Sequence, residues 1–182
     1  VSLTSFVEAC SQIKGISGII NSDIRFLMQR SFESIAADVI LHKAKKQPSL
    51  ILFSRLEIGS FVSQVSSELA DLGLQPFLHG DVYSYGFDLM LACQDTWMLL
   101  GKHLRDDLPL GMGVPWWDYY IPSLAQKLNI KVFIVHPTPI GHLYHEAVYS
   151  KEMWISSSRP ILELLFNQED SEDAKRVDQI IS

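Results

Sequence analysis

The chain has 182 residues, of which 47% are hydrophobic and 20% are charged, enough for one folded domain with a sizeable core. Its 15 Lys and Arg against 21 Asp and Glu give a net charge of −6. This acidic balance disfavours sequence-independent binding to nucleic acid and attraction to anionic lipid. The apolar runs have the length of strands, so we expect no membrane span.

The cysteines and the first residues of the sequence indicate in which cellular compartment the protein is expected. Cys10 and Cys93 lie in apolar segments without metal-type spacing, which is typical of reduced packing residues in a cytoplasmic protein. No basic and then apolar leader opens the chain, so we expect no secretory signal. Because the first residue is Val1 and not Met, we expect a piece of a longer protein.

Apolar residues recur at helical spacing in several segments. Ser2 or Thr4 is expected to cap the first helix and Gly15 to end it, while Pro122 falls near the first turn of a later helix. The spacing predicts helices over residues 3–14, 32–41, 59–73, 94–103 and 119–128, loop plus helix over 142–154, and a last helix from 159.

Short apolar runs between these helices predict strands. They cover residues 16–20, 49–53, 87–93 and 131–135, whereas 75–86 are expected to form a loop and the charged residues 169–173 a loop or solvated helix face. Strands that alternate with helices predict an α/β fold with a mostly parallel sheet and flanking helices. We expect one α/β domain over residues 1–155, with residues 156–182 as a helical tail packed on it.

Polar clusters follow the predicted strands or lie in loops. They are Asn21-Ser22-Asp23, Arg55 with Glu57, Asp118, and the pair His142 and His145. Since parallel strands end at one edge of a sheet, the clusters can meet there. A carboxylate with an imidazole suits Mg²⁺ or Mn²⁺ that also holds phosphates. A second, metal-free carboxylate could then act as a general base toward a hydroxyl.

Each cluster also has a structural interpretation. Asn-Ser-Asp is a common turn sequence, Arg55 can pair with Glu57 or another acid, and two histidines three residues apart share a helix face by chance. Asp88 can be a buried, hydrogen-bonded acid. The sequence leaves these alternatives open.

The segment 110–122, LGMGVPWWDYYIP, concentrates glycine, proline and aromatic residues around one acid. Aromatic faces with polar tips suit a ligand that is half apolar and half hydroxylated, such as a sugar ring. The alternative is a core helix that buries Trp116 and Trp117, with Asp118 capping it or solvated.

Five of these segments, in order, resemble GT-A-type nucleotide-diphosphosugar transferases, in particular a bacterial glycosyltransferase-like group. Residues 18–24, GIINSDI, resemble its strand-end NADI or NSDI form of the DxD motif, and residues 51–58, ILFSRLEI, its next strand. Residues 86–91, GFDLML, are similar to its G-x-D-L-F-V-F strand. Residues 110–120 resemble its G-x-x-x-W-D-x-W segment and residues 142–145 its H-x-x-H element. The match covers about residues 16–154.

The resemblance implies a GT-A-like fold and a role for each matched position. Asp23, supported by Asn21, would contact a divalent metal (Mn²⁺ or Mg²⁺) or the diphosphate of a nucleotide-sugar donor. His145, or as second choice His142, would be a late metal ligand, and Asp118 the acceptor-activating base of inverting enzymes. The residues assigned to binding the donor and its sugar are Asn21, Asp23, Arg55, Asp88, Trp116 and Trp117. The acceptor would be a glycan or another hydroxyl compound.

The chain departs from the family pattern in two ways. Asn-Ser-Asp supplies one carboxylate where a full DxD supplies two. The family's domain normally has an upstream half that grips the nucleotide base, and here one predicted helix precedes Asn21, so we expect that half to be missing or to belong to an upstream domain. The alternatives are therefore a non-catalytic glycan-binding or assembly module on the same scaffold and, more remotely, a metal-dependent hydrolase.

Overall fold

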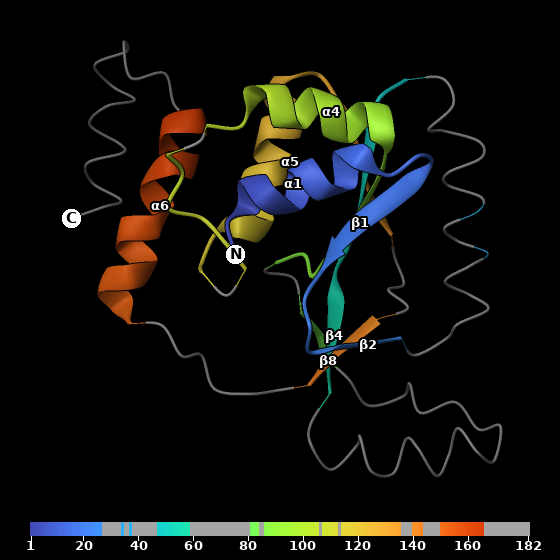
Figure 1. Ribbon diagram of the computed structural model, residues 1–182. Helices are drawn as coiled ribbons and strands as arrows, with labels where there is room; N and C mark the ends of the chain where they lie inside the picture. The colour runs from blue at the N-terminus through green and yellow to red at the C-terminus, as the bar shows by residue number, and fades with distance from the viewer. Residues whose placement is uncertain are drawn as a thin grey trace, which may run out of the picture.

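The chain forms two mixed four-stranded sheets with helices packed beside them (Figure 1). The computed structural model describes residues 1–26, 34, 37, 47–58, 81–83, 86–105, 107–112, 114–135, 140–143 and 150–165. The α/β class predicted from the sequence is confirmed.

The first sheet has the strand order β1-β6-β3-β7. Its strands are β1 (Ile16–Ile20), β3 (Ser49–Phe53), β6 (Leu89–Cys93) and β7 (Lys131–Val135). Strand β6 runs antiparallel to both β1 and β3, and only the β3–β7 pair is parallel. The expectation of a mostly parallel sheet is therefore wrong. A strand buried on both faces, as β3 is, has a continuous apolar sequence whichever way its neighbours run.

The second sheet, in the order β2-β8-β4-β5, continues the strands of the first. Its strands are β2 (Ile24–Phe26), β4 (Arg55–Ile58), β5 (Asp81–Tyr83) and β8 (Ile140–Leu143). In Figure 1, β2, β4 and β8 lie together below β1. The predicted loop over 75–86 is wrong at β5, and β8 replaces the loop or helix expected from residue 142. Strands of three or four residues are too short to show a periodic pattern.

Residues 21–23 link β1 of the first sheet to β2 of the second sheet. Strand β1 lies at an edge of its sheet beside β6, and β2 lies at an edge of the other sheet beside β8. The predicted Asn-Ser-Asp motif is therefore a connection between the two sheets.

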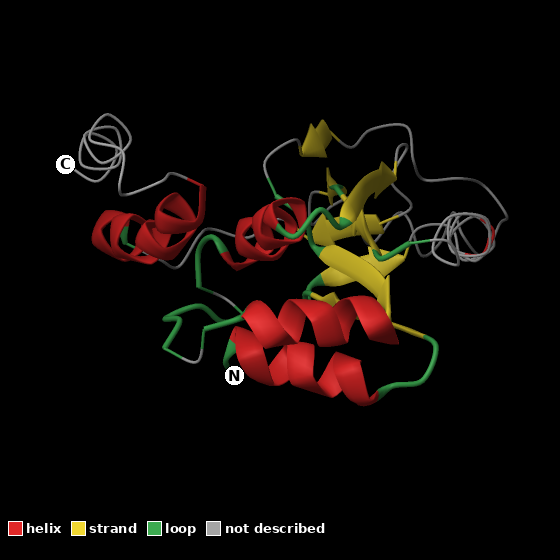
Figure 2. Cartoon of the chain, turned by 90° about the horizontal axis from the view of Figure 1, so that it is seen from above, coloured by secondary structure: helices red, strands yellow, loops and turns green. Residues whose placement is uncertain are grey.

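Three helices cover one face of the first sheet. These are α1 (Leu3–Gln12), α4 (Gln94–His103) and α5 (Trp117–Lys127), and Figure 2 shows α1 and α4 side by side. Alternate strand residues such as Leu50, Leu52 and Met90 meet them in the main core, while Ile51 and Phe53 belong to a smaller cluster on the other face. As predicted, Ser2 caps α1, because its Oγ accepts the Ser5 N–H at 3.2 Å.

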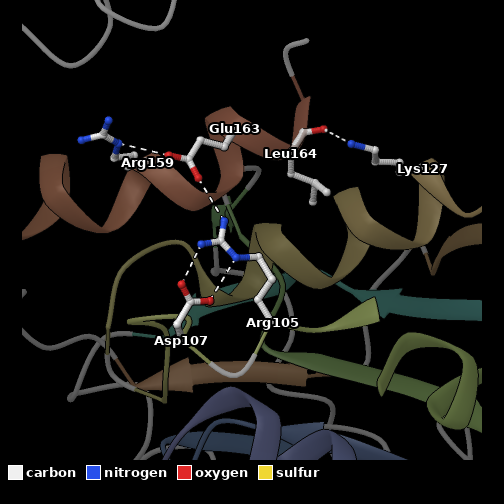
Figure 3. Close-up of polar contacts among 6 residues, drawn as sticks. All are labelled: Arg105, Asp107, Lys127, Arg159, Glu163 and Leu164. Carbon is white, nitrogen blue, oxygen red and sulfur yellow. Dashed lines mark hydrogen bonds and ion pairs between the residues drawn. The ribbon is translucent and has the colours of Figure 1, made fainter. Parts of the chain in front are cut away.

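Helix α6 (Lys151–Leu165) packs on α5, which lies between it and the sheet (Figure 1). It starts before the predicted residue 159, and the predicted domain boundary at 155–156 falls inside it. Figure 3 shows how polar contacts hold its C-terminal half. Arg105, after α4, bonds both Asp107 oxygens and reaches Glu163 of α6 at 3.1 Å, and Lys127 of α5 donates to the carbonyl of Leu164.

Several predicted segments fall outside the described residues. These are the helix over 59–73, the charged segment 169–173 and most of the helix over 32–41, of which Ser34 and Ala37 are described and helical. The observed helices differ modestly at their ends, because α1 stops at Gln12 and α5 starts at Trp117. No helix among the described residues is long and apolar enough to cross a bilayer.

We expect the close approach of β1 and β6 to depend on Gly18. A Cβ at this position would overlap the carbonyl oxygen of Met90 and the side chain of Leu91. Gly18→Ala should lower the free energy of unfolding by about 1–3 kcal/mol, measured by urea denaturation. The control is Gly101→Ala in α4, where the new Cβ meets Val7 at an ordinary 3.5 Å and should be neutral or stabilising. Equal stability of both variants would contradict the expectation.

Candidate functional site

The antiparallel direction of β6 brings Asp88 to the edge where β1 and β3 end. Asp88 lies directly before β6, not within it as predicted from the sequence. Its carbonyl accepts the N–H of Asn21 at 3.0 Å, and its own N–H donates to the carbonyl of Phe53 at 3.3 Å. The ends of three strands are thereby joined by backbone hydrogen bonds at the junction of the two sheets.

The Asp88 carboxylate joins two of the other predicted site residues. Its Oδ1 accepts from Asn21 Nδ2 at 2.5 Å and its Oδ2 from Arg55 Nη1 at 2.6 Å. Asp88 is 1% exposed, and a charge this deep is tolerated only when it is paired and hydrogen-bonded. Asp88 is thus the buried acid of the structural interpretation, and it also holds Asn21 and Arg55 at the sheet edge.

A second carboxylate, Asp118, approaches this cluster from α5. It lies in the first turn of that helix, and its Oδ2 accepts the backbone N–H of Phe87 at 3.2 Å. Burial raises the pKa of Asp118 to about 6; the Phe87 N–H opposes the rise, the charge of Asp88 adds to it and Arg55 opposes it. A carboxyl group with a pKa near neutrality is suited to accept a proton from a hydroxyl.

Asp23, directly before β2, pairs with His142 of β8. Asp23 Oδ2 lies 3.0 Å from His142 Nε2, which projects from β8 and is 6% exposed as a residue. His145, the first choice as metal ligand from the resemblance, lies outside the described residues. The second choice, His142, is described and contacts Asp23.

The Asp23–His142 pair fits part of a divalent cation site. A carboxylate and an imidazole are side chains that can hold a divalent cation, and such a cation would replace the 3.0 Å hydrogen bond between Asp23 and His142. The described residues contain no group of three or more metal-ligating side chains. Magnesium is commonly held by one or two carboxylates and completes its shell with substrate phosphates and water, and Asp23 supplies one such carboxylate.

The two tryptophans separate into a core residue and a surface residue. Trp117 is 4% exposed and lies in the main core, so we leave it out of the ligand-contacting set. Trp116 has φ 76°, a left-handed backbone that costs a bulky residue about 1–3 kcal/mol. Its ring packs on Trp154 of α6 with centroids 4.4 Å apart, and its Nε1 donates to the Trp154 carbonyl at 2.8 Å.

Two residues of this region were missed by the sequence analysis as site residues. Phe87 supplies the N–H that holds Asp118, and its position next to Asp88 could have indicated it. Trp154 meets Trp116 from 38 residues away along the chain, and no local pattern connects them. The contact depends on how α6 packs on α5.

No protein-family model matches the sequence, and searches of curated proteins and of solved structures gave no match either.

We expect the buried pair at Asp88 to matter for stability. Asp88→Asn removes the charge that faces Arg55 while keeping the size of the side chain, and should cost about 3 kcal/mol in urea denaturation. The control is Asp107→Asn, which removes a similar pair with Arg105 on the exposed surface and should cause no measurable change. Similar losses in both variants would contradict a special role for the buried pair.

The raised pKa of Asp118 predicts a pH dependence. Because its folded-state value of about 6 exceeds the ordinary 3.8, the folded chain binds more protons than the unfolded chain between these values. The free energy of unfolding should therefore fall by up to about 3 kcal/mol as the pH rises through this window, relative to Asp118→Asn. Urea denaturation of both proteins across the window measures the difference. Parallel pH profiles would show that burial does not raise this pKa.

Proposed function

We propose that this chain is a glycosyltransferase-like domain on a GT-A-like scaffold. It would transfer a sugar from a nucleotide-diphosphate donor to a hydroxyl acceptor, with Mn²⁺ or Mg²⁺ bound. The observation that carries the proposal is the convergence of Asn21, Asp23, Arg55, Asp88 and Asp118 on one junction between the sheets. These residues come from four chain segments, and each of them belongs to the larger set of positions that the resemblance to the transferase family implies.

In this proposal the donor side is formed by Asp23 and His142. They would hold the cation, whose charge offsets the negative charge on the leaving nucleotide diphosphate. Arg55 is held by Asp88 and would contribute a positive charge toward the diphosphate.

The acceptor side is formed by Asp118. Its carboxylate would take the proton of the acceptor hydroxyl while the acceptor oxygen bonds to the anomeric carbon of the donor sugar. The bond from that carbon to the diphosphate breaks, and the diphosphate leaves with the electron pair. Because Asp118 is held by the Phe87 N–H, the base is positioned before substrate binds.

One observation favours the alternative, a non-catalytic glycan-binding or assembly module. Both oxygens of Asp88 are engaged by protein side chains, so that carboxylate acts within the scaffold and does not reach toward a ligand. The two proposals differ in the roles of Asp23 and Asp118. The transferase needs Asp23 to hold the cation and Asp118 to act as the base, whereas a non-catalytic module needs neither role.

Calorimetry with UDP- and GDP-sugars in the presence and absence of Mn²⁺ tests the transferase. Asp23→Ala should weaken metal-dependent binding by at least about tenfold, the loss that follows even from removing outer-shell partners of a metal site. Asp118→Asn should bind donor normally and lose transfer by about 10²–10⁴-fold. The control is Asp95→Ala, an exposed acid in the first turn of α4. No binding of any nucleotide sugar, with or without metal, would contradict the proposal for this chain.

A further inference from the structure

An unbroken row of aromatic rings leads from Asp118 to α6. Phe87, whose N–H holds Asp118, lies 6.4 Å from Tyr119; Tyr119 lies 5.6 Å from Trp116, and Trp116 lies 4.4 Å from Trp154, all measured between ring centroids. We call these four residues the aromatic row. Its members come from the segment before β6, from the start of α5 and from α6.

Trp154, at the α6 end of the aromatic row, is its most exposed residue. Phe87, Tyr119 and Trp116 are partly buried and pack against the main core, whereas Trp154 is 40% exposed. The position of Trp154 is fixed by its carbonyl, which accepts from Trp116 Nε1, and by the packing of α6 on α5. The Arg105–Glu163 ion pair adds a further tie between α6 and the rest of the domain (Figure 3). The row is therefore a built surface and not one exposed tryptophan.

Its chemistry fits one class of ligand. Aromatic faces take the C–H side of a sugar ring, while the nearby carboxylate of Asp118 accepts from hydroxyls. The carboxylate of Asp118 at the inner end of the row disfavours an anionic sugar unit there. Trp154 offers an exposed ring at the outer end of the row, and the partly buried rings of Trp116 and Tyr119 continue from it toward Asp118.

We infer that the aromatic row is the acceptor subsite, which binds a neutral saccharide of two or more units with one end at Asp118 and the other on Trp154. This inference rests on the proposed function, because it identifies the acceptor of the transfer. It adds α6 to the site and makes Trp154 a residue that contacts substrate.

Saturation-transfer NMR with maltose, cellobiose and lactose, and with glucose as the single-unit comparison, tests the inference. The disaccharides should bind more tightly than glucose, and Trp154→Ala should weaken their binding by about three- to tenfold. Trp154→Phe should restore part of the loss, because it returns an aromatic face. The control is Met153→Ala, a neighbour on α6 that is equally exposed at 40%. Circular dichroism of each variant checks that the helices persist.

The outcomes separate this inference from the proposed function. If UDP or GDP binds with Mn²⁺ but none of the disaccharides binds, or if Trp154→Ala and Met153→Ala behave alike, the acceptor subsite is wrong and the transferase stands. If the disaccharides bind through Trp154 but no nucleotide binds, the row is a saccharide site and the transferase is wrong.

Discussion

The buried carboxylate of Asp88 is the constraint on which the junction between the two sheets depends. It holds Asn21 through one oxygen and Arg55 through the other, and its backbone joins the ends of β1 and β3. Removing a charge of this kind from water is costly, so the fold must keep both partners in place. The segments that carry Asp23 and the start of β4 are fixed as a result.

The direction of β6 decides where this constraint acts. Because β6 is antiparallel to its neighbours, it begins at the edge where β1 and β3 end. Phe87 and Asp88, which directly precede β6, therefore both lie at that edge. A parallel strand would have carried them to the opposite edge. Phe87 in turn holds Asp118 at the first turn of α5, so one strand direction assembles both carboxylates.

Helix α6 adds Trp154 to the region around Trp116 and Asp118. Its packing on α5 places Trp154 against Trp116, whose left-handed backbone is stabilised by this contact and by the hydrogen bond from its indole N–H. Strained backbone at a bulky residue is often found at ligand-binding sites, where the surrounding structure maintains it. Trp116 with its strained backbone, Tyr119 of the aromatic row and Asp118 with its raised pKa lie within residues 116–119.

The sequence by itself determined the α/β class, the strands β1, β3, β6 and β7 and the helices α1 and α4, because these have clear apolar periods. It also named the polar residues Asn21, Asp23, Arg55, Asp88 and Asp118, since each lies next to a strand or a glycine-rich loop. Only the tertiary structure decided the direction of β6, the second sheet, the pairing of His142 with Asp23 and the contact of Trp154 with Trp116. These depend on pairing between distant segments, and local periodicity carries no information about strand direction or long-range partners.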